Sequence, residues 1–522
     1  MIKALFYINL EQIFAMNRSA ANDNFVWTLS IWLLSTVLMA IALLSTYMAT
    51  EANSALFGHS DLIQPYMLAR DILANPAAIL DWYHSPALYV FPDWLLAMIL
   101  VAWVPGSDRV LPLLYSVILL LAYSIAGSWL LRQSLNTSLL RGTWLLVTIS
   151  VVSACVTHHD LTTPMTTWLF LTGSTAYIHT GALVLTLVAG GLLMRCLQRP
   201  SATGTAIMAL IGAITTFSDA LFMVWFVAPA CVVLLLHAWA QRSGPPLITI
   251  AWISGAGLIA MLVEHLLRST KPELHRIEPS KSLQVFISDL QAVVSAGDVG
   301  FMLMLVAIMV IALRAAIMIL RLLRRQTLTP AAYLELFLAG SISAALLAPL
   351  ALGVYWDLTL WRYLLVIPVL VIIWVVHCVL KLSPQWQYGL TTGAIITTLG
   401  LGTVSISSAW EHIQSLQQPI ALEQCLREQG RDTGFGDYWN AKRLLFLSDR
   451  RLHIIQINAV GQPFHMNYNR RWFAERADTG APVQPDFVIL DRLDAGVIAR
   501  RFGSPKQVIH CDGSAIWLYP RR

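Results

Sequence analysis

The sequence predicts a mainly α-helical membrane protein with a small α/β domain at its C-terminus. Of its 522 residues, 57% are hydrophobic and 12% charged, whereas an average soluble protein has about 25% charged residues. The mean hydropathy of +0.65 indicates that hydrocarbon surrounds most of the chain. After residue 408 the long apolar runs stop and short alternating segments begin. The net charge of +5 is small for this length, so nucleic acid is not an expected partner.

Long apolar runs set the number of predicted membrane helices. Eleven of them cover residues 27–49, 110–131, 138–156, 178–196, 204–222, 223–240, 246–265, 300–323, 331–352, 360–381 and 387–408. The run at 27–49 is too long and starts too late for a cleaved signal peptide, so residues 1–24 are expected to form a cytoplasmic tail.

Basic residues in short connections predict the direction of these helices. Five connections without Asp or Glu carry Arg132 with Arg141, Arg195 with Arg199, Arg242, Arg321 with Arg324 and Arg325, and Lys381. The positive-inside rule places all five on the cytoplasmic side. The N-terminus is then inside, and the C-terminal domain is outside.

This direction decides how an ambiguous apolar run at 86–104 is interpreted. If the run crossed the membrane, the arginine connections would change sides. It follows Ser85, is interrupted by Pro92-Asp93 and carries Trp94 and Trp103, which are features of a helix lying in the membrane interface. A competing count of twelve spans would include it and place the arginine connections outside.

The chain therefore divides into three predicted parts. Residues 1–24 form the tail, 25–408 the transmembrane domain and 409–522 an extracytoplasmic α/β domain. The first external loop, 50–109, contains the interfacial helices. The short loops carry no eukaryotic targeting signal, which favours the inner membrane of a bacterium.

Two acids in the first two external loops are the candidate catalytic residues. Asp61 and Asp160 can divide the activation and positioning of substrates, or share a divalent cation together with His159. A general base must be ionised and close to an acceptor hydroxyl. The alternative for Asp61 is a structural role as the N-cap of a helix at about 62–74. Both interpretations remain open at this stage.

Further polar residues on the same side are candidates for substrate binding. They are His59, Arg70, His84, His158, His159, Asp219, Trp356 and Arg362. Asp219 lies between two apolar runs, and an ionisable residue so close to hydrocarbon is a functional candidate. The structural alternatives are a hairpin tip for Asp219, surface ion pairing for Arg70 and a place in the aromatic belt for Trp356.

The C-terminal region has its own pattern of short elements. Asp437 can cap a helix that reaches about residue 447, and strands are expected at 452–457 and 485–490. A helix is expected near 495–502, and the strands of 506–519 turn at Asp512-Gly513. Cys425 and Cys511 are the cysteines of this domain, and an extracytoplasmic location would permit a disulfide between them.

The order of these parts resembles the GT-C glycosyltransferases, nearest to the protein mannosyltransferases and aminoarabinose transferases. The resemblance rests on the external Asp61, the segment Ser85-Pro86-Ala87-Leu88-Tyr89, an interfacial helix ending at Pro105-Gly106, and Arg109-Val110-Leu111-Pro112. It covers roughly residues 25–200 by pattern. The single Asp61, preceded by His59-Ser60, departs from the paired acids of that family.

The resemblance implies a glycosyltransferase that takes a sugar from a polyprenyl-phosphate donor and transfers it to an external glycan, lipid or protein. It implies that Asp61 is the catalytic acid of the first loop and Asp160 that of the second. Two other functions stay open, which are a transporter or flippase of a lipid-linked solute and a non-enzymatic subunit of envelope-polysaccharide assembly.

Overall fold

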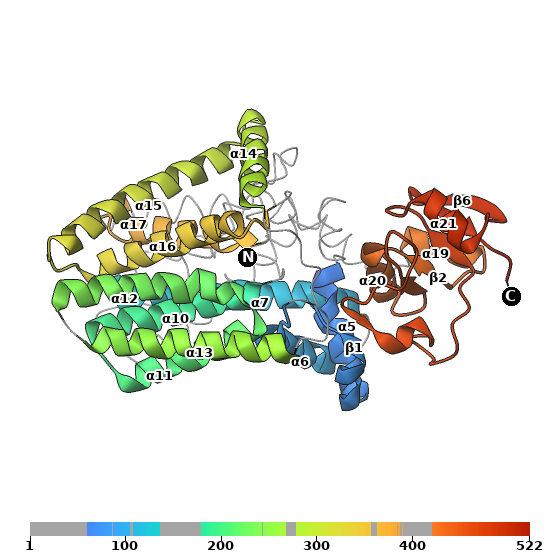
Figure 1. Ribbon diagram of the computed structural model, residues 1–522, viewed down its shortest axis with the longest axis horizontal. Coiled ribbons are helices and arrows are strands. Elements are labelled where there is room, and N and C mark those ends of the chain that lie inside the picture. The colour runs from blue at the N-terminus through green and yellow to red at the C-terminus, as the bar shows by residue number, and fades with distance from the viewer. Residues whose placement is uncertain are drawn as a thin grey trace, which may run out of the picture.

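Figure 1 shows the computed structural model of the chain, a bundle of long helices with a smaller α/β domain at one end. The structure describes residues 60–85, 87–104, 108–135, 179–242, 244–267, 278–355, 363–383, 385, 386, 389 and 420–521. The expected spans at 27–49 and 138–156, and nearly all of the span at 387–408, lie outside these ranges. The count of eleven spans therefore stays a prediction.

The helices of the bundle follow the expected apolar runs closely. They are α7 (Leu111–Leu135), α10 (Thr180–Gln198), α11 (Ala202–Ser218), α12 (Ala228–Gln241, preceded by the π-helical turn η5, Met223–Val227), α13 (Pro245–Leu267), α15 (Val299–Leu323), α16 (Pro330–Ala351) and α17 (Val366–Val379). Within the described ranges, six helices are long and apolar enough to cross a membrane. Helices satisfy every backbone hydrogen bond internally, as hydrocarbon requires. The chain is therefore a multi-pass membrane protein.

Contacts between helix ends place the basic connections together, as the sequence predicts. Gln198 at the end of α10 donates a hydrogen bond to the carbonyl of Gln133 at the end of α7. The Arg325 guanidinium after α15 lies 5.7 Å from the Trp239 ring of α12. Lys381 after α17 contacts Glu335 near the start of α16 at 2.9 Å. We call this end of the bundle the arginine end, and the opposite one, which is predicted to lie outside, the external end.

The ambiguous run at 86–104 forms no membrane-spanning helix. It contains a π-helical turn, η3 (Val90–Trp94), and α6 (Leu95–Trp103), which has nine residues. Nine residues of α-helix rise about 14 Å, less than half of the bilayer core of about 30 Å. This length supports the interpretation as an interfacial segment.

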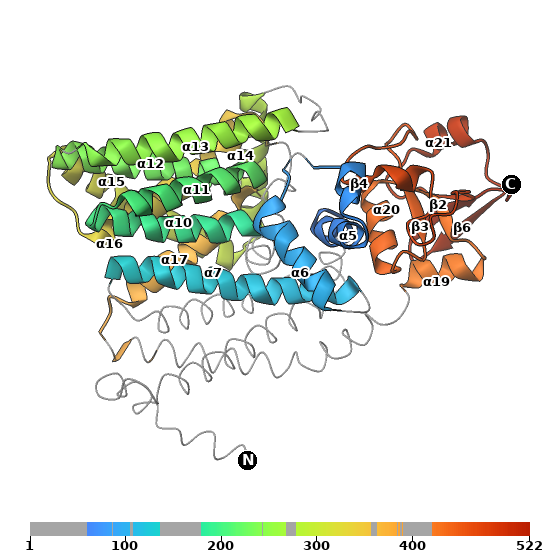
Figure 2. The same cartoon turned by 90° about the horizontal axis from the view of Figure 1, so that it is seen from below.

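Two helices lie across the external end of the bundle. α5 (Ser60–Ala74) runs crosswise in Figure 1 and is seen end-on in Figure 2. The helix begins at Ser60, so Asp61 belongs to its first turn and does not take the N-cap position that the alternative interpretation gave it. α14 (Pro279–Ser295) lies between α13 and α15 in the chain, where no helix was predicted.

The C-terminal domain contains the expected strands and helices around one mixed sheet. Its elements are α19 (Ala421–Glu428), β2 (Thr433–Gly436), α20 (Tyr438–Leu447), β3 (His453–Gln456), β4 (Tyr468–Asn469), β5 (Phe487–Ile489), α21 (Ala495–Phe502), β6 (Gln507–Cys511) and β7 (Ser514–Leu518). Of these, α19, β2 and β4 were not predicted. The strand order is β3-β2-β5-β7-β6, with β2 parallel to β3 and β5. Cys425 and Cys511 form the predicted disulfide, which joins α19 to β6.

The C-terminal domain packs against the first external loop. Strand β1 (Trp82–Tyr83) pairs antiparallel with β4, so that Trp82 lies opposite Asn469. The indoles of Trp82 and Trp472 meet edge to face with centroids 5.1 Å apart. Both residues belong to a buried cluster that α5, α6 and α7 share with α20. Burial of large aromatic side chains dominates such interfaces, so this contact fixes α20 against α5.

Candidate functional site

Asp61 lies where α5 meets α20 at the external end. The hydroxyl of Tyr438 donates a hydrogen bond to Asp61 Oδ1. Asn467 in turn donates from Nδ2 to the Tyr438 oxygen at 3.0 Å, which orients the phenol. Ser60, the neighbour of Asp61, donates from Oγ to the Trp439 carbonyl at 2.7 Å. The first loop and the C-terminal domain therefore build the surroundings of Asp61 together.

The sequence explains why Tyr438 reaches Asp61. Asp437 caps α20, and its Oδ1 accepts hydrogen bonds from the backbone N–H of Trp439 at 2.8 Å and of Asn440 at 3.4 Å. A capping carboxylate fixes the first turn of a helix. Tyr438 is the first residue of that turn and is therefore held in one orientation toward α5.

Lys442 brings a positive charge to the same junction. It follows Tyr438 by one helical turn, is fully buried, and places Nζ 3.7 Å from the centroid of the Tyr438 ring. Nζ has no hydrogen-bond partner among the described residues. Burial lowers the pKa of Lys442 to about 7, and the negative charge of Asp61 acts in the opposite direction. We call Asp61, Tyr438, Lys442 and Asn467 the junction cluster.

A second polar group, which we call the rim cluster, lies where η3 meets the ends of α10 and α11. It consists of Asp93, Tyr115, His179 and Asp219. His179 Nδ1 lies 2.6 Å from Asp219 Oδ2, and both side chains are at most 5% exposed. The Tyr115 hydroxyl donates to Asp93 Oδ1 at 2.5 Å. Burial raises the pKa of Asp93 to about 6, and the charge of Asp219 acts in the same direction.

Local backbone contacts hold the rim cluster in place. Ser218 at the end of α11 accepts hydrogen bonds from the backbone N–H of Tyr89 and Phe91, through its carbonyl and Oγ respectively. Asp219 Oδ1 accepts from the Leu221 N–H at 3.0 Å, which is the turn expected of Ser-Asp. Gly181 permits the close approach of η3 to α10, because a Cβ there would lie 2.5 Å from Asp93 Oδ2.

Tyr66 of α5 packs between Tyr115 of the rim cluster and Phe446 of α20, the helix that also carries part of the junction cluster. Its ring meets that of Tyr115 edge to face with centroids 6.1 Å apart, and the Phe446 ring of α20 lies at the same distance. Burial raises the pKa of Tyr66, and the charge of Asp93 adds to this effect. The two clusters therefore lie on opposite sides of α5 at the external end.

A third polar network, centred on Asp71, holds the first loop against the C-terminal domain. Buried Asp71 accepts hydrogen bonds from Trp82 at 2.9 Å, Asn469 at 2.7 Å and Arg450 at 2.8 Å. The cation of this network is Arg450 of the C-terminal domain. This network joins α5, β1 and β4, and its groups satisfy one another.

The other predicted site residues divide into described and undescribed ones. Arg70 is half-buried on α5, and the half-buried His84 ring lies 5.4 Å from that of Trp94, with its pKa lowered by burial. His59, His158, His159, Asp160, Trp356 and Arg362 lie outside the described residues. Of the predicted set, Asp61 joins the junction cluster and Asp219 joins the rim cluster.

Several residues of the two clusters were not predicted. Tyr438 and Lys442 lie about 380 positions after Asp61, and no local pattern connects the two segments. Asp93 was taken only as part of a helix break, and His179 only as the start of an apolar run. A signal was present for Asp93, because it is an acid inside the apolar segment 86–104.

The arrangement offers carboxylates and hydrogen-bond donors at one end of the bundle. Within the described ranges, no three His, Cys, Asp or Glu side chains lie close enough together to bind a metal ion. The metal site expected at Asp61, Asp160 and His159 includes two undescribed residues and stays a prediction. No protein-family description matches the chain, and no curated protein is significantly similar to it in sequence.

Proposed function

We propose that the chain is a membrane glycosyltransferase that moves a sugar from a polyprenyl-phosphate donor to an acceptor on the external side. The observation that carries this proposal is the position of Asp61. It lies in the first turn of a helix that runs across the external end, and Tyr438 and Lys442 of the C-terminal domain surround it. A hydrogen-bond donor and a nearby positive charge both favour the ionised carboxylate, which is the form a general base needs.

In the proposed reaction, Asp61 removes the proton from the acceptor hydroxyl as its oxygen attacks the anomeric carbon. The bond from that carbon to the phosphate oxygen breaks, and polyprenyl phosphate leaves with the electron pair. One direct displacement inverts the anomeric centre. The leaving phosphate gains negative charge in the transition state, which a nearby cation would stabilise. Asp160 is the proposed second acid, through the resemblance to GT-C enzymes.

The rim cluster is the proposed site for sugar hydroxyls. His179 and Asp219 form a buried hydrogen-bonded pair, and Asp93, with its pKa of about 6, can donate or accept a hydrogen bond near neutral pH. Sugar hydroxyls need both donors and acceptors, which such a pair supplies. Arg70 and His84 are further candidates in the same loop.

The proposal places the protein in the inner membrane of a bacterium, with the C-terminal domain in the periplasm. The disulfide between Cys425 and Cys511 supports this orientation, because disulfides persist in oxidising compartments. The arginine end would then face the cytoplasm, in agreement with the positive-inside rule.

The test is donor consumption by the purified protein in liposomes that contain radiolabelled polyprenyl-phosphate sugar. Release of the label from the lipid, by transfer or by hydrolysis, is the expected result. Movement of intact donor between leaflets without cleavage would contradict the proposal and favour a flippase. Neither cleavage nor movement, with each candidate acceptor class added, would favour a non-enzymatic assembly subunit.

A further inference from the structure

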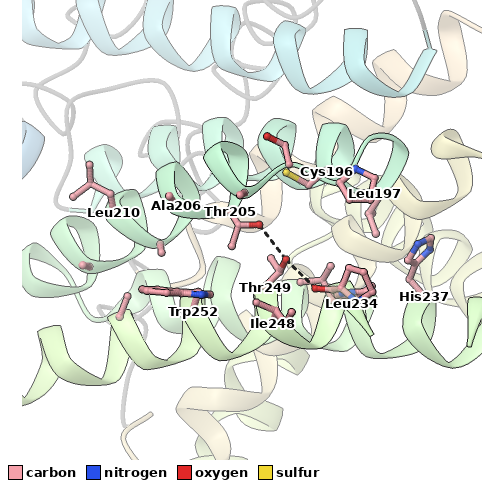
Figure 3. A pocket seen from close by; sticks show the side chains of 18 residues that line it. Cys196, Leu197, Thr205, Ala206, Leu210, Leu234, His237, Ile248, Thr249 and Trp252 are labelled. Atoms are coloured by element: carbon pink, nitrogen blue, oxygen red, sulfur yellow. Dashed lines mark hydrogen bonds between the residues drawn. The ribbon is translucent and has the colours of Figure 1, made fainter. Parts of the chain in front are cut away.

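An apolar cavity lies between α11 and α13 at the arginine end of the bundle. Its volume is about 730 Å³, and α10 and α12 contribute the rest of its wall. Figure 3 shows Leu210 and Trp252 at one side of the cavity and His237 at the other. The candidate catalytic groups lie at the opposite end of the bundle, so the cavity is separate from that site and its role does not depend on the proposed function.

The polar groups of this cavity are already paired with protein. Thr205 Oγ1 and Thr249 Oγ1 are hydrogen-bonded at 3.1 Å, as the dashed line in Figure 3 shows. His237 Nδ1 is 2.8 Å from the Tyr333 hydroxyl. The remaining wall is mostly aliphatic and aromatic. A polar solute would find few hydrogen-bond partners here, whereas a hydrocarbon chain would enter without the cost of an unsatisfied hydrogen bond.

The length of the cavity corresponds to one leaflet of a bilayer. On α11 its wall extends from Ala202, at the start of the helix, to Ala213. Eleven residues of α-helix rise about 16 Å, and half of a bilayer core is about 15 Å thick. On α13 the exposed side chains of Ile248 and Trp252, both more than 60% exposed, place the cavity at the lipid-facing surface.

Basic residues adjoin the lining of the cavity in the sequence, and we call this edge of the cavity, near Pro200 and Pro245, its mouth. Arg199 ends α10 directly before Pro200, which lines the cavity, and Arg242 ends α12 three residues before Pro245, which also lines it. Both arginines are exposed. From Arg195 to Val263 the sequence contains one acid, Asp219, and it lies at the other end of α11. Within this stretch of the chain, no acid lies at the same end to compensate the two positive charges.

We propose that this cavity binds an anionic phospholipid of the leaflet at the arginine end. One acyl chain occupies the space between α11 and α13, and the phosphate is held at the membrane boundary by Arg199 and Arg242. Basic residues between membrane helices attract anionic headgroups, each contributing about 1 kcal/mol near the surface. Because the two threonine hydroxyls bond to each other, the wall that the acyl chain contacts is apolar. The arginines provide selectivity for an anionic headgroup.

The test is native mass spectrometry of delipidated full-length protein, titrated in detergent with phosphatidylglycerol or with phosphatidylcholine of the same acyl chains. Wild type should bind one phosphatidylglycerol more tightly than phosphatidylcholine. The double variant Arg199→Gln/Arg242→Gln should weaken phosphatidylglycerol roughly 30-fold, because two contributions of about 1 kcal/mol multiply. Binding of phosphatidylcholine, whose headgroup also carries a phosphate but has no net charge, should weaken less.

Two further variants keep the proposal testable. Arg321→Gln is the matched control, since it removes an exposed arginine from the same end on α15, and it should leave the affinity within about twofold. Ala206→Trp fills the cavity and should weaken both lipids. Equal affinity for the two lipids, an equal loss in Arg321→Gln, or unchanged binding in Ala206→Trp would each overturn the proposal.

Discussion

The carboxylates at the two ends of the helical bundle receive their partners in different ways. At the arginine end, Glu335 of α16 is 1% exposed and accepts hydrogen bonds from Arg314, His377 and Lys381 of neighbouring helices. At the external end, Asp71 and Asp61 receive partners from the C-terminal domain, hundreds of positions away.

This difference distinguishes a structural ion-pair network from a candidate functional site. Arg314, His377 and Lys381 saturate Glu335 and fix the packing of α15, α16 and α17 without help from outside the bundle. Asp61 and Asp71 depend instead on the docking of a second domain, which brings Tyr438, Lys442 and Arg450 to them. A carboxylate completed by a second domain can respond to what binds between the two parts.

The largest stability effect is expected at Asp71. The variant Arg450→Gln removes its cation and leaves a carboxylate that is 9% exposed with two neutral donors. An uncompensated buried charge costs about 3 kcal/mol, so thermal unfolding in detergent should occur at a clearly lower temperature. Arg471→Gln is the control, because its pair with Asp81 is 58% and 26% exposed and contributes less than about 1 kcal/mol. Equal shifts would contradict a docking role for Asp71.

A smaller effect is expected in the pH dependence of stability, through Lys442. Its pKa is about 7 in the folded protein and 10.5 without burial, so folding releases protons between these values. Stability should therefore rise with pH in this window, by about 2 kcal/mol between pH 7 and pH 8.5. Lys442→Met should remove that rise, and Lys506→Met, at an exposed lysine, should keep it. A rise that persists in Lys442→Met would show that another group is responsible.

The smallest effect is expected at Glu335, despite its burial. The variant Glu335→Gln leaves Arg314 and Lys381, which are 45% and 40% exposed, so solvent and headgroups can still hydrate both charges. We expect a loss of about 1 kcal/mol, less than for Arg450→Gln. Unfolding temperatures of the two variants in one detergent give this ranking. The reverse ranking would mean that the arginine end, and not domain docking, limits stability.

Local patterns predicted most of the fold. Uninterrupted apolar runs predicted the helices, and Asp512-Gly513 predicted the hairpin of β6 and β7. The basic connections, such as those at Arg199 and Lys381, were predicted to share one end of the bundle, as they do. These features depend on neighbours in the chain. The helix α14 was not predicted, because it is amphipathic and forms no long uninterrupted apolar run.

The surroundings of the candidate site could be predicted only in part. Asp61 and Asp219 stand out as acids beside apolar segments, and each joins a polar cluster. Their partners could not be predicted, because Tyr438 and Lys442 reach Asp61 through the pairing of β1 with β4 and not through any sequence spacing. The buried pair of His179 and Asp219 depends likewise on how α10 and α11 pack.

The most direct test of the account compares sugar transfer by Asp61→Asn and Asp81→Asn in the same donor assay. Both variants remove one carboxylate from the first external loop, and their unfolding temperatures report whether each is folded. If Asp61 is the general base, Asp61→Asn should lose transfer by about 10²- to 10⁴-fold while folded, and Asp81→Asn should keep the wild-type rate. Wild-type transfer by folded Asp61→Asn would contradict the proposed role of Asp61.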